Sequence, residues 1–111
     1  MSVDINGTTI KMTRGDTLKV YVTPSYKDGT PYEPVEGDRI RFALKRKISD
    51  DEEPIILREI PIDTLLLHIL PEETKGLEYG VYVYDIEITY VNGDVDTFIT
   101  KAPFKLTEEV D

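Results

Sequence analysis

The sequence contains no cysteine and no tryptophan, and its only histidine is His68. Without cysteine the chain can form no disulfide scaffold, no thiolate nucleophile and no cysteine-containing zinc site. Basic residues are scarce too, since 13 lysines and arginines stand against 22 acidic residues and leave a formal net charge of -9. Because affinity for nucleic acid comes from clustered lysine and arginine, we expect no nucleic-acid partner.

Long apolar runs are also missing. No stretch of the sequence is long enough to cross a membrane, and the polar residues 1–4 do not resemble the start of a signal peptide. We therefore expect no membrane partner, no secretion by a signal peptide and synthesis in the cytoplasm. The length of 111 residues predicts a single domain over residues 1–111, with loose ends at 1–7 and 107–111.

The sequence does contain runs in which apolar and polar residues alternate, which is the pattern of half-buried β-strands. Residues 18–23, 39–45 and 81–90 alternate in this way, and the segments 54–60 and 64–70, rich in isoleucine and leucine, are also predicted strands. The side chains expected to face the core are Leu18, Val20 and Val22, then Ile40, Phe42 and Leu44, and then Tyr82, Tyr84, Ile86, Ile88 and Tyr90. Three consecutive leucines leave the inward side of residues 64–70 undecided.

Turn residues separate these runs. Asn92-Gly93 is the strongest hairpin signal, because a two-residue type I′ turn needs positive φ at both central positions. Such a turn would place Tyr90 opposite Val95, Ile88 opposite Thr97 and Ile86 opposite Ile99, all on the core side. Further along, the apolar positions change parity, which predicts a β-bulge near residues 101–103. Residues 71–76 begin with proline and acids and end with glycine, which predicts one short helical turn.

An acidic residue, a glycine and a tyrosine occupy alternate positions where the longest predicted strand begins, at Glu78, Gly80 and Tyr82. This pattern resembles the corner before strand F of immunoglobulin-like sandwiches, where the tyrosine ring is buried and its hydroxyl bonds to nearby backbone. We therefore predict an all-β, immunoglobulin-like β-sandwich of about 7–8 antiparallel strands with one short helical turn near residues 71–76. The residues expected to support this structure are Tyr82, Gly80, Asn92, Gly93 and Gly15.

The sequence shows no set of residues that usually act together in catalysis. His68 has no second histidine to complete a typical metal or acid–base site, and no serine lies in a Gly-x-Ser-x-Gly motif. Carboxylates are abundant, but nothing marks two of them as a pair in one cleft. Residues 92–96 superficially suggest a calcium loop but fail the EF-hand spacing, so a hairpin turn is the better interpretation. We expect no enzyme activity, no cofactor and no metal.

Basic and acidic side chains should meet on the outer face of two neighbouring strands. The basic residues are Arg39, Arg41, Lys45 and Lys47, and the acidic residues are Asp85 and Glu87. We expect cross-strand ion pairs, each contributing at most about 1 kcal/mol, in preference to an anion-binding site. Arg14-Gly15-Asp16 matches a tripeptide that some cell-surface receptors recognise, but a tight turn between two strands is the simpler interpretation.

Some aromatic and apolar side chains are expected outside the core, where they would form a contact surface. These possible interface residues are Tyr21, Tyr26, Tyr32, Val81, Val83 and Phe98. Protein interfaces and sugar-binding platforms both use exposed aromatic side chains, so the pattern by itself leaves both functions open.

Several segments of the sequence, taken in order, resemble one family. Residues 10–17, IKMTRGDT, resemble an "ITxTRGDT" start, and residues 28–32 with 37–42 resemble a "DGxPxxLxGxxVxF" stretch. Residues 70–77 with 80–86 resemble an "LTPEDTxGLxxGxYxYDI" segment. These patterns are typical of the N-terminal domains of baseplate upper proteins of tailed phages of Gram-positive hosts, and of related single-domain prophage proteins.

The resemblance implies an immunoglobulin-like domain that acts by assembly in a virion, without catalysis, with the baseplate or tail as candidate locations. Its implied partners are other virion proteins or copies of itself, so a homo-oligomer is compatible with it. The implied location is the bacterial host cytoplasm before assembly and the virion afterwards. The family has longer members, and a small stand-alone virion protein fits the sequence equally well. The alternative function is a host-surface glycan-binding or adhesion module that uses exposed tyrosines, with calcium held by acidic loops.

Overall fold

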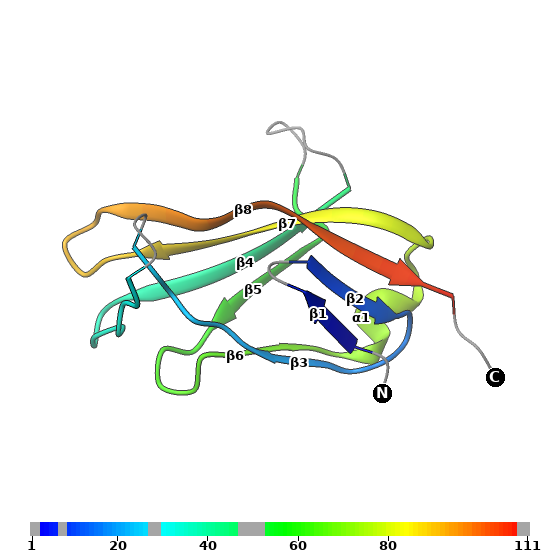
Figure 1. Cartoon of the computed structure of the whole chain (residues 1–111), viewed down its shortest axis with the longest axis horizontal. Coiled ribbons are helices and arrows are strands. Elements are labelled where there is room, and N and C mark those ends of the chain that lie inside the picture. Colours follow the sequence, from blue (N-terminus) through cyan, green and yellow to red (C-terminus); the bar gives the residue numbers. More distant parts are fainter. Residues whose placement is uncertain (1–2, 7–8, 27–29, 47–52, 109–111) are drawn as a thin grey trace.

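The structure is a computed structural model, and it describes residues 3–6, 9–26, 30–46 and 53–108. In these residues, six strands form one curled mixed sheet in the order β1-β2-β8-β7-β4-β5, and β3 pairs with β6 in a second, smaller sheet (Figure 1). The elements are β1 (Val3–Asn6), β2 (Thr9–Thr13), β3 (Leu18–Tyr21), β4 (Arg39–Lys45), β5 (Ile56–Ile60), β6 (Leu66–Ile69), α1 (Pro71–Lys75), β7 (Gly80–Thr89) and β8 (Val95–Thr107). The prediction of a mostly β fold with one short helical turn is therefore confirmed.

The core lies between the two sheets and is built by the predicted alternation. Along β4 and β7 every second side chain is buried, among them Phe42 on β4 and Tyr84 on β7. These two rings pack with their centroids 5.5 Å apart, and Phe104 of β8 lies 6.4 Å from Phe42. Burial of large apolar side chains is the main favourable term in folding, so this aromatic group anchors the large sheet.

The small sheet contributes the opposite wall of the core. In the antiparallel β3–β6 register, Leu18 lies opposite Ile69 and Val20 lies opposite Leu67. The side chains of Leu18, Leu67 and Ile69 are all completely buried. This result settles which side of β6 faces inward, a point that the three consecutive leucines left open.

Not all strands are antiparallel, which corrects the prediction. Strand β2 runs parallel to the last part of β8, with Ile10 opposite Phe104 and Met12 opposite Leu106. The pairing lets the buried side chains of Ile10 and Met12 join the core at the edge of the large sheet. Residues 3–6 fall within the end that we expected to be loose, but they form β1 and pair with β2.

The turn of the β7–β8 hairpin differs from the predicted type I′ turn. The Gly93 N–H donates to the Tyr90 carbonyl at 2.8 Å, and the Tyr90 N–H donates to the Asp94 carbonyl at 2.7 Å. Gly93 has a φ of +96°, whereas Asn92 is not in the positive-φ region. The loop therefore has three residues, with glycine in the left-handed position. The Asn92 side-chain oxygen instead accepts a 2.9 Å hydrogen bond from the Asp94 N–H.

The longer loop shifts the register at the tip of the hairpin. Thr89, and not Tyr90, lies opposite Val95, and the predicted pairing of Ile88 with Thr97 is likewise wrong. Val95 is 54% exposed, although it was expected on the core side. Only the predicted pairing of Ile86 with Ile99 is confirmed.

Strand β8 contains two irregularities. One lies at Lys101, whose φ is +50° and whose N–H donates to the Asp85 carboxylate at 2.6 Å. It confirms the predicted bulge near residues 101–103. The other leaves Phe98 without an opposite residue on β7, so Phe98 and Ile99 both line the inner side of the sheet. Phe98 was expected to point outward, and the three-residue loop explains the error, because one extra residue in the turn reverses the parity of the residues that follow it.

The corner before β7 has the predicted local geometry. The Tyr82 ring is buried, and its hydroxyl donates to the Glu78 carbonyl at 2.6 Å. Gly80, which opens β7, lies between these two residues in the sequence.

Removal of this hydroxyl in Tyr82→Phe is expected to lower the free energy of unfolding by about 1 kcal/mol, because one hydrogen bond is lost while the buried ring stays. Urea unfolding measures the difference. The matched control is Tyr21→Phe, since Tyr21 is 74% exposed and its substitution should change stability by less than about 0.5 kcal/mol. Equal stability of Tyr82→Phe and the wild type would contradict a stabilising role for the corner.

Candidate functional site

Three tyrosines gather near the tip of the β7–β8 hairpin and form what we call the tyrosine cluster, Tyr26, Tyr32 and Tyr90. The ring of Tyr32 makes edge contacts with the other two, with centroid distances of 5.3 Å in both cases. The Tyr90 hydroxyl donates to the Asp96 carboxylate at 3.0 Å. Tyr26 is 47% exposed, whereas Tyr32 is partly buried, so the expectation of two freely exposed tyrosines is correct only for Tyr26.

Asp38 is the buried carboxylate on which this end of the molecule depends. One of its oxygens accepts hydrogen bonds from the Tyr32 hydroxyl at 2.5 Å and from the Val35 N–H at 2.9 Å, and the other accepts from the Val91 N–H at 3.0 Å. Gly37 precedes it with a φ of +99°, and a Cβ there would lie 2.9 Å from a Val91 methyl carbon. The chain therefore needs glycine beside Asp38 to bring the two loops together.

The environment of Asp38 keeps it charged and keeps its tyrosine partner protonated. Burial alone would raise the pKa of Asp38, but the hydrogen bonds from Tyr32, Val35 and Val91 outweigh burial and lower it below its ordinary value. The same hydrogen bond to the carboxylate is the main reason that the pKa of Tyr32 rises to about 12. At neutral pH these groups exchange no proton, so they act as a structural anchor and not as an acid–base pair.

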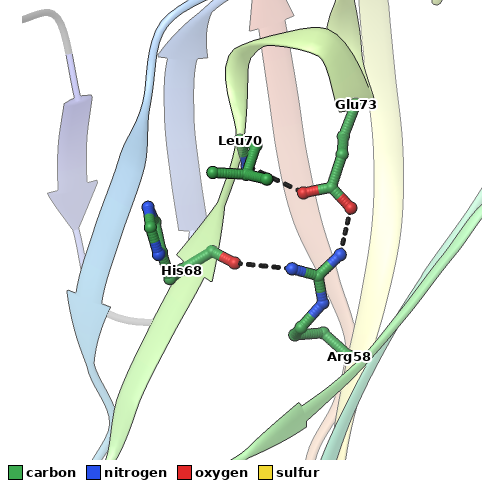
Figure 2. A network of polar contacts seen from close by, with 4 residues as sticks. All are labelled: Arg58, His68, Leu70 and Glu73. Atoms are coloured by element: carbon green, nitrogen blue, oxygen red, sulfur yellow. Dashed lines mark hydrogen bonds and ion pairs between the residues drawn. The ribbon is translucent and has the colours of Figure 1, made fainter.

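A second polar group joins the two sheets at the α1 end. The Arg58 side chain extends from β5, forms an ion pair with Glu73 on α1 and donates to the His68 carbonyl of β6 at 3.1 Å (Figure 2). Glu73 also accepts a 2.7 Å hydrogen bond from the Leu70 N–H at the start of the helix. His68 takes part in this network through its backbone, which agrees with a structural histidine on a strand.

The Arg14-Gly15-Asp16 turn packs against the corner around α1. The Arg14 guanidinium lies 4.2 Å from the centroid of the Tyr79 ring and donates to the Leu77 carbonyl at 3.2 Å. The Gly15 N–H donates to the hydroxyl of the fully buried Thr74 at 2.9 Å. These contacts hold the tripeptide as a structural turn, as the simpler interpretation expected, and sequence patterns gave no sign of the Thr74 contact.

The charged outer face of the large sheet is arranged differently from the prediction. Strands β4 and β7 are neighbours, and Arg41 lies opposite Glu87 as expected. The ion pair of Arg39, however, is with Glu59 of β5 at 2.7 Å, between side chains that are more than half exposed. Exposed pairs of this kind contribute little to stability. Lys47 lies outside the described residues.

A pocket of about 330 Å³ lies between the small sheet and β8. Its walls include Val20 and Tyr21 of β3 and both Phe98 and Ile99 of β8, and Tyr84 of β7 also lines it. Burial raises the pKa of Tyr84 to about 12, so this hydroxyl stays protonated. The lining residues include no carboxylate, amine or imidazole, so the pocket offers apolar contact and hydroxyl groups without an acid–base pair.

The structure does not bring the predicted interface residues together on one surface. Val81 is 62% exposed and lies with Val83 on the outer face of the large sheet. Tyr21 is 74% exposed, as expected, but it lies with Phe98 at the pocket between the sheets.

The sequence analysis did not identify several other exposed apolar residues, among them Leu57 on β5, Val35 before β4 and Val91 in the hairpin loop. In β5 the side chains of Ile56 and Ile60 are buried, so the alternation along the strand would have placed Leu57 on the exposed face.

Neither the protein-family models nor the curated proteins contain a match to this chain. In the described part of the chain, no helix is long and apolar enough to span a membrane. Over the same residues, no group of three or more histidine, cysteine, aspartate or glutamate side chains is placed to hold a metal ion.

Replacement of the buried carboxylate in Asp38→Asn is expected to lower the free energy of unfolding by about 2 kcal/mol at neutral pH, because an amide cannot accept from all three donors. The folded-state pKa of Asp38 lies below its ordinary value of 3.8, so its stabilising effect is present above that pH and is lost as the pH falls further. Urea unfolding at about pH 7 and about pH 3 should therefore show a smaller difference between variant and wild type in acid. The exposed Asp63→Asn is the control, and a difference independent of pH would contradict the assignment.

Tyr32 should contribute to a loss of stability in alkali, as should Tyr84, whose pKa also rises to about 12. The folded-state pKa of Tyr32 is raised from 10.0 to about 12, so the stability it contributes is complete below pH 10 and is lost as the pH rises towards 12. Spectroscopic titration of tyrosinate should show one late-ionising phenol fewer in Tyr32→Phe than in the wild type. In Asp38→Asn the same phenol should ionise at lower pH, because its charged hydrogen-bond partner is gone. Loss of a phenol that ionises near pH 10 in Tyr32→Phe, together with an unchanged titration of Asp38→Asn, would show that the hydrogen bond does not form.

Proposed function

We propose that this chain is a non-catalytic structural module of a phage or prophage particle and acts by protein–protein assembly, with the baseplate or tail as its location. The observation that carries the proposal is the ordered resemblance of residues 10–17, 28–42 and 70–86 to domains of baseplate upper proteins. The implied partners are other virion proteins or further copies of the chain.

The strand arrangement supports an immunoglobulin-like form of the fold, which is part of this proposal. Strands β2, β8, β7, β4 and β5 face the β3–β6 pair, and the buried Tyr82 bonds to the backbone at the corner before β7. This combination of two facing sheets and a corner tyrosine is typical of immunoglobulin-like sandwiches.

The use of the polar side chains supports a non-catalytic role. Asp38 accepts hydrogen bonds from three donors that belong to the fold, and Arg58 and Glu73 neutralise each other between the sheets. A catalytic acid or base must instead have a proton or a lone pair that is available to a bound substrate. The pocket between the sheets has no such group among its lining residues.

A second candidate function is glycan binding at the tyrosine cluster. The structure brings two of the predicted interface residues, Tyr26 and Tyr32, into ring contact, and Tyr26 is 47% exposed. An exposed aromatic ring beside acidic groups can stack on a sugar. In this case Tyr26→Ala should abolish binding to host cell walls without loss of stability.

The assembly proposal is tested by expression of the tagged chain during phage production, followed by purification and mass spectrometry of the proteins bound to it. Known particle proteins should co-purify with the wild type. Val81→Asp, which changes a side chain that is 62% exposed on the outer face, should reduce this yield, whereas Val35→Asp, at 52% exposed in a loop, is the matched control. Recovery of no particle protein, together with cell-wall binding that depends on Tyr26, would replace assembly by glycan recognition.

A further inference from the structure

Strand β8 has two halves with different neighbours. Its last residues, Phe104–Thr107, pair with β2 on the side away from β7. Its first half, from Val95 to Lys101, pairs with β7 alone in the part of the chain that the structure describes (Figure 1). Backbone N–H and C=O groups of alternate residues in this half therefore point away from β7, although the Lys101 N–H is already bonded to Asp85, and such an edge can accept another strand.

The free half of β8 has only some of the features that usually protect an edge. Its sequence, VDTFITK, contains no proline or glycine and carries charge only on Asp96 and Lys101. Edge strands that avoid association commonly carry charged side chains, prolines, β-bulges or a covering segment, and of these the segment has two charges and two bulges but no proline. The irregularities at Phe98 and Lys101 twist the strand, and among the described residues no strand other than β7 pairs with this half.

Apolar side chains lie directly behind this edge. Phe98 and Ile99 are both only partly buried, and both line the 330 Å³ pocket that opens between β8 and β3. A strand added to β8 would place its own side chains against these two residues and would narrow the mouth of the pocket. Added strands of this kind gain affinity from backbone hydrogen bonds and specificity from alternate side chains.

The sequence of the edge is complementary to itself when two copies run antiparallel. With a two-fold axis between Phe98 and Ile99, each Phe98 lies opposite the Ile99 of the other copy and each Thr97 lies opposite a Thr100. The same register places Asp96 opposite Lys101 twice, so both charges of the segment find an opposite partner. Cross-strand pairs of opposite charge and of apolar side chains stabilise a sheet, whereas like charges directly opposite destabilise it.

We propose that two copies of this chain associate through antiparallel pairing of the first half of β8, residues 95–101, in the register that joins Asp96 of each copy to Lys101 of the other. The large sheets of the two copies then form one continuous sheet with an isologous, closed interface. This inference deepens the proposed assembly role and rests on it for its biological meaning, since it names the surface by which copies would meet.

Analytical ultracentrifugation over a range of concentrations tests the proposal with the intact chain. The wild type should shift from 12.7 kDa towards twice that mass as concentration rises. Lys101→Glu and Asp96→Lys should each raise the dimer dissociation constant by about tenfold or more, because each variant alone places two pairs of like charges opposite one another. An equimolar mixture of the two variants should recover the dimer, since the mixed pair again has opposite charges at both positions.

The matched control is Lys105→Glu, an exposed lysine in the half of β8 that β2 already covers, and it should leave the dissociation constant unchanged. Asp96→Lys also removes the acceptor of the Tyr90 hydroxyl, so circular dichroism must show that it folds, while Lys101→Glu leaves that contact intact. A single-copy mass up to about 1 mM would overturn the proposal. A dimer unaffected by Lys101→Glu would overturn it as well. A single-copy chain that still co-purifies with particle proteins would overturn the β8 pairing and leave the virion role standing.

Discussion

The large sheet depends on the bulge at Lys101. Strand β8 pairs with β7 along its length and with β2 in its last part, and the β8 residues that face the core change from odd-numbered to even-numbered positions between Ile99 and Phe104. From Val95 to Ile99 the strand follows β7, and from Phe104 onward it also pairs with β2. Regular alternation continued from Ile99 would turn Phe104 and Leu106 towards solvent, whereas they are 0% and 2% exposed. The extra residue, held by the bond from the Lys101 N–H to Asp85, corrects the parity.

The two sheets differ greatly in size, and polar contacts at both ends compensate for the small area that β3 and β6 cover. At one end the charged Asp38 joins the loop before β4 to the tip of the β7–β8 hairpin. At the other, Arg58 joins β5 to β6 and α1. Between these ends the free half of β8 extends past the small sheet, which leaves the pocket and the unpaired edge side by side.

Period-two alternation identified most strands and their buried side chains, because successive side chains of a strand point to opposite faces and the apolar ones face the core. The pairing of β2 with β8 was not accessible in this way, since it joins residues more than 90 positions apart and local patterns carry no information on partners. Asn92-Gly93 is compatible with two turn types, and the wrong choice shifted the register of the hairpin tip. Asp38 was missed, although an acidic residue directly before a strand with buried alternate residues is itself a signal.

A chain with a net charge of -9 repels its own copies, so the proposed assembly must depend on local complementarity and not on overall attraction. The groups that are most strongly perturbed or buried, Asp38 and its tyrosine partner, are already used within the fold. The proposed contact therefore uses the free backbone edge of β8 and the apolar side chains beside it, Phe98 and Ile99. In this edge Asp96 and Lys101 lie on either side of Phe98 and Ile99. Two copies can therefore offset the general repulsion only when their strands run antiparallel with Asp96 of each opposite Lys101 of the other. That selectivity is what the proposed assembly role requires.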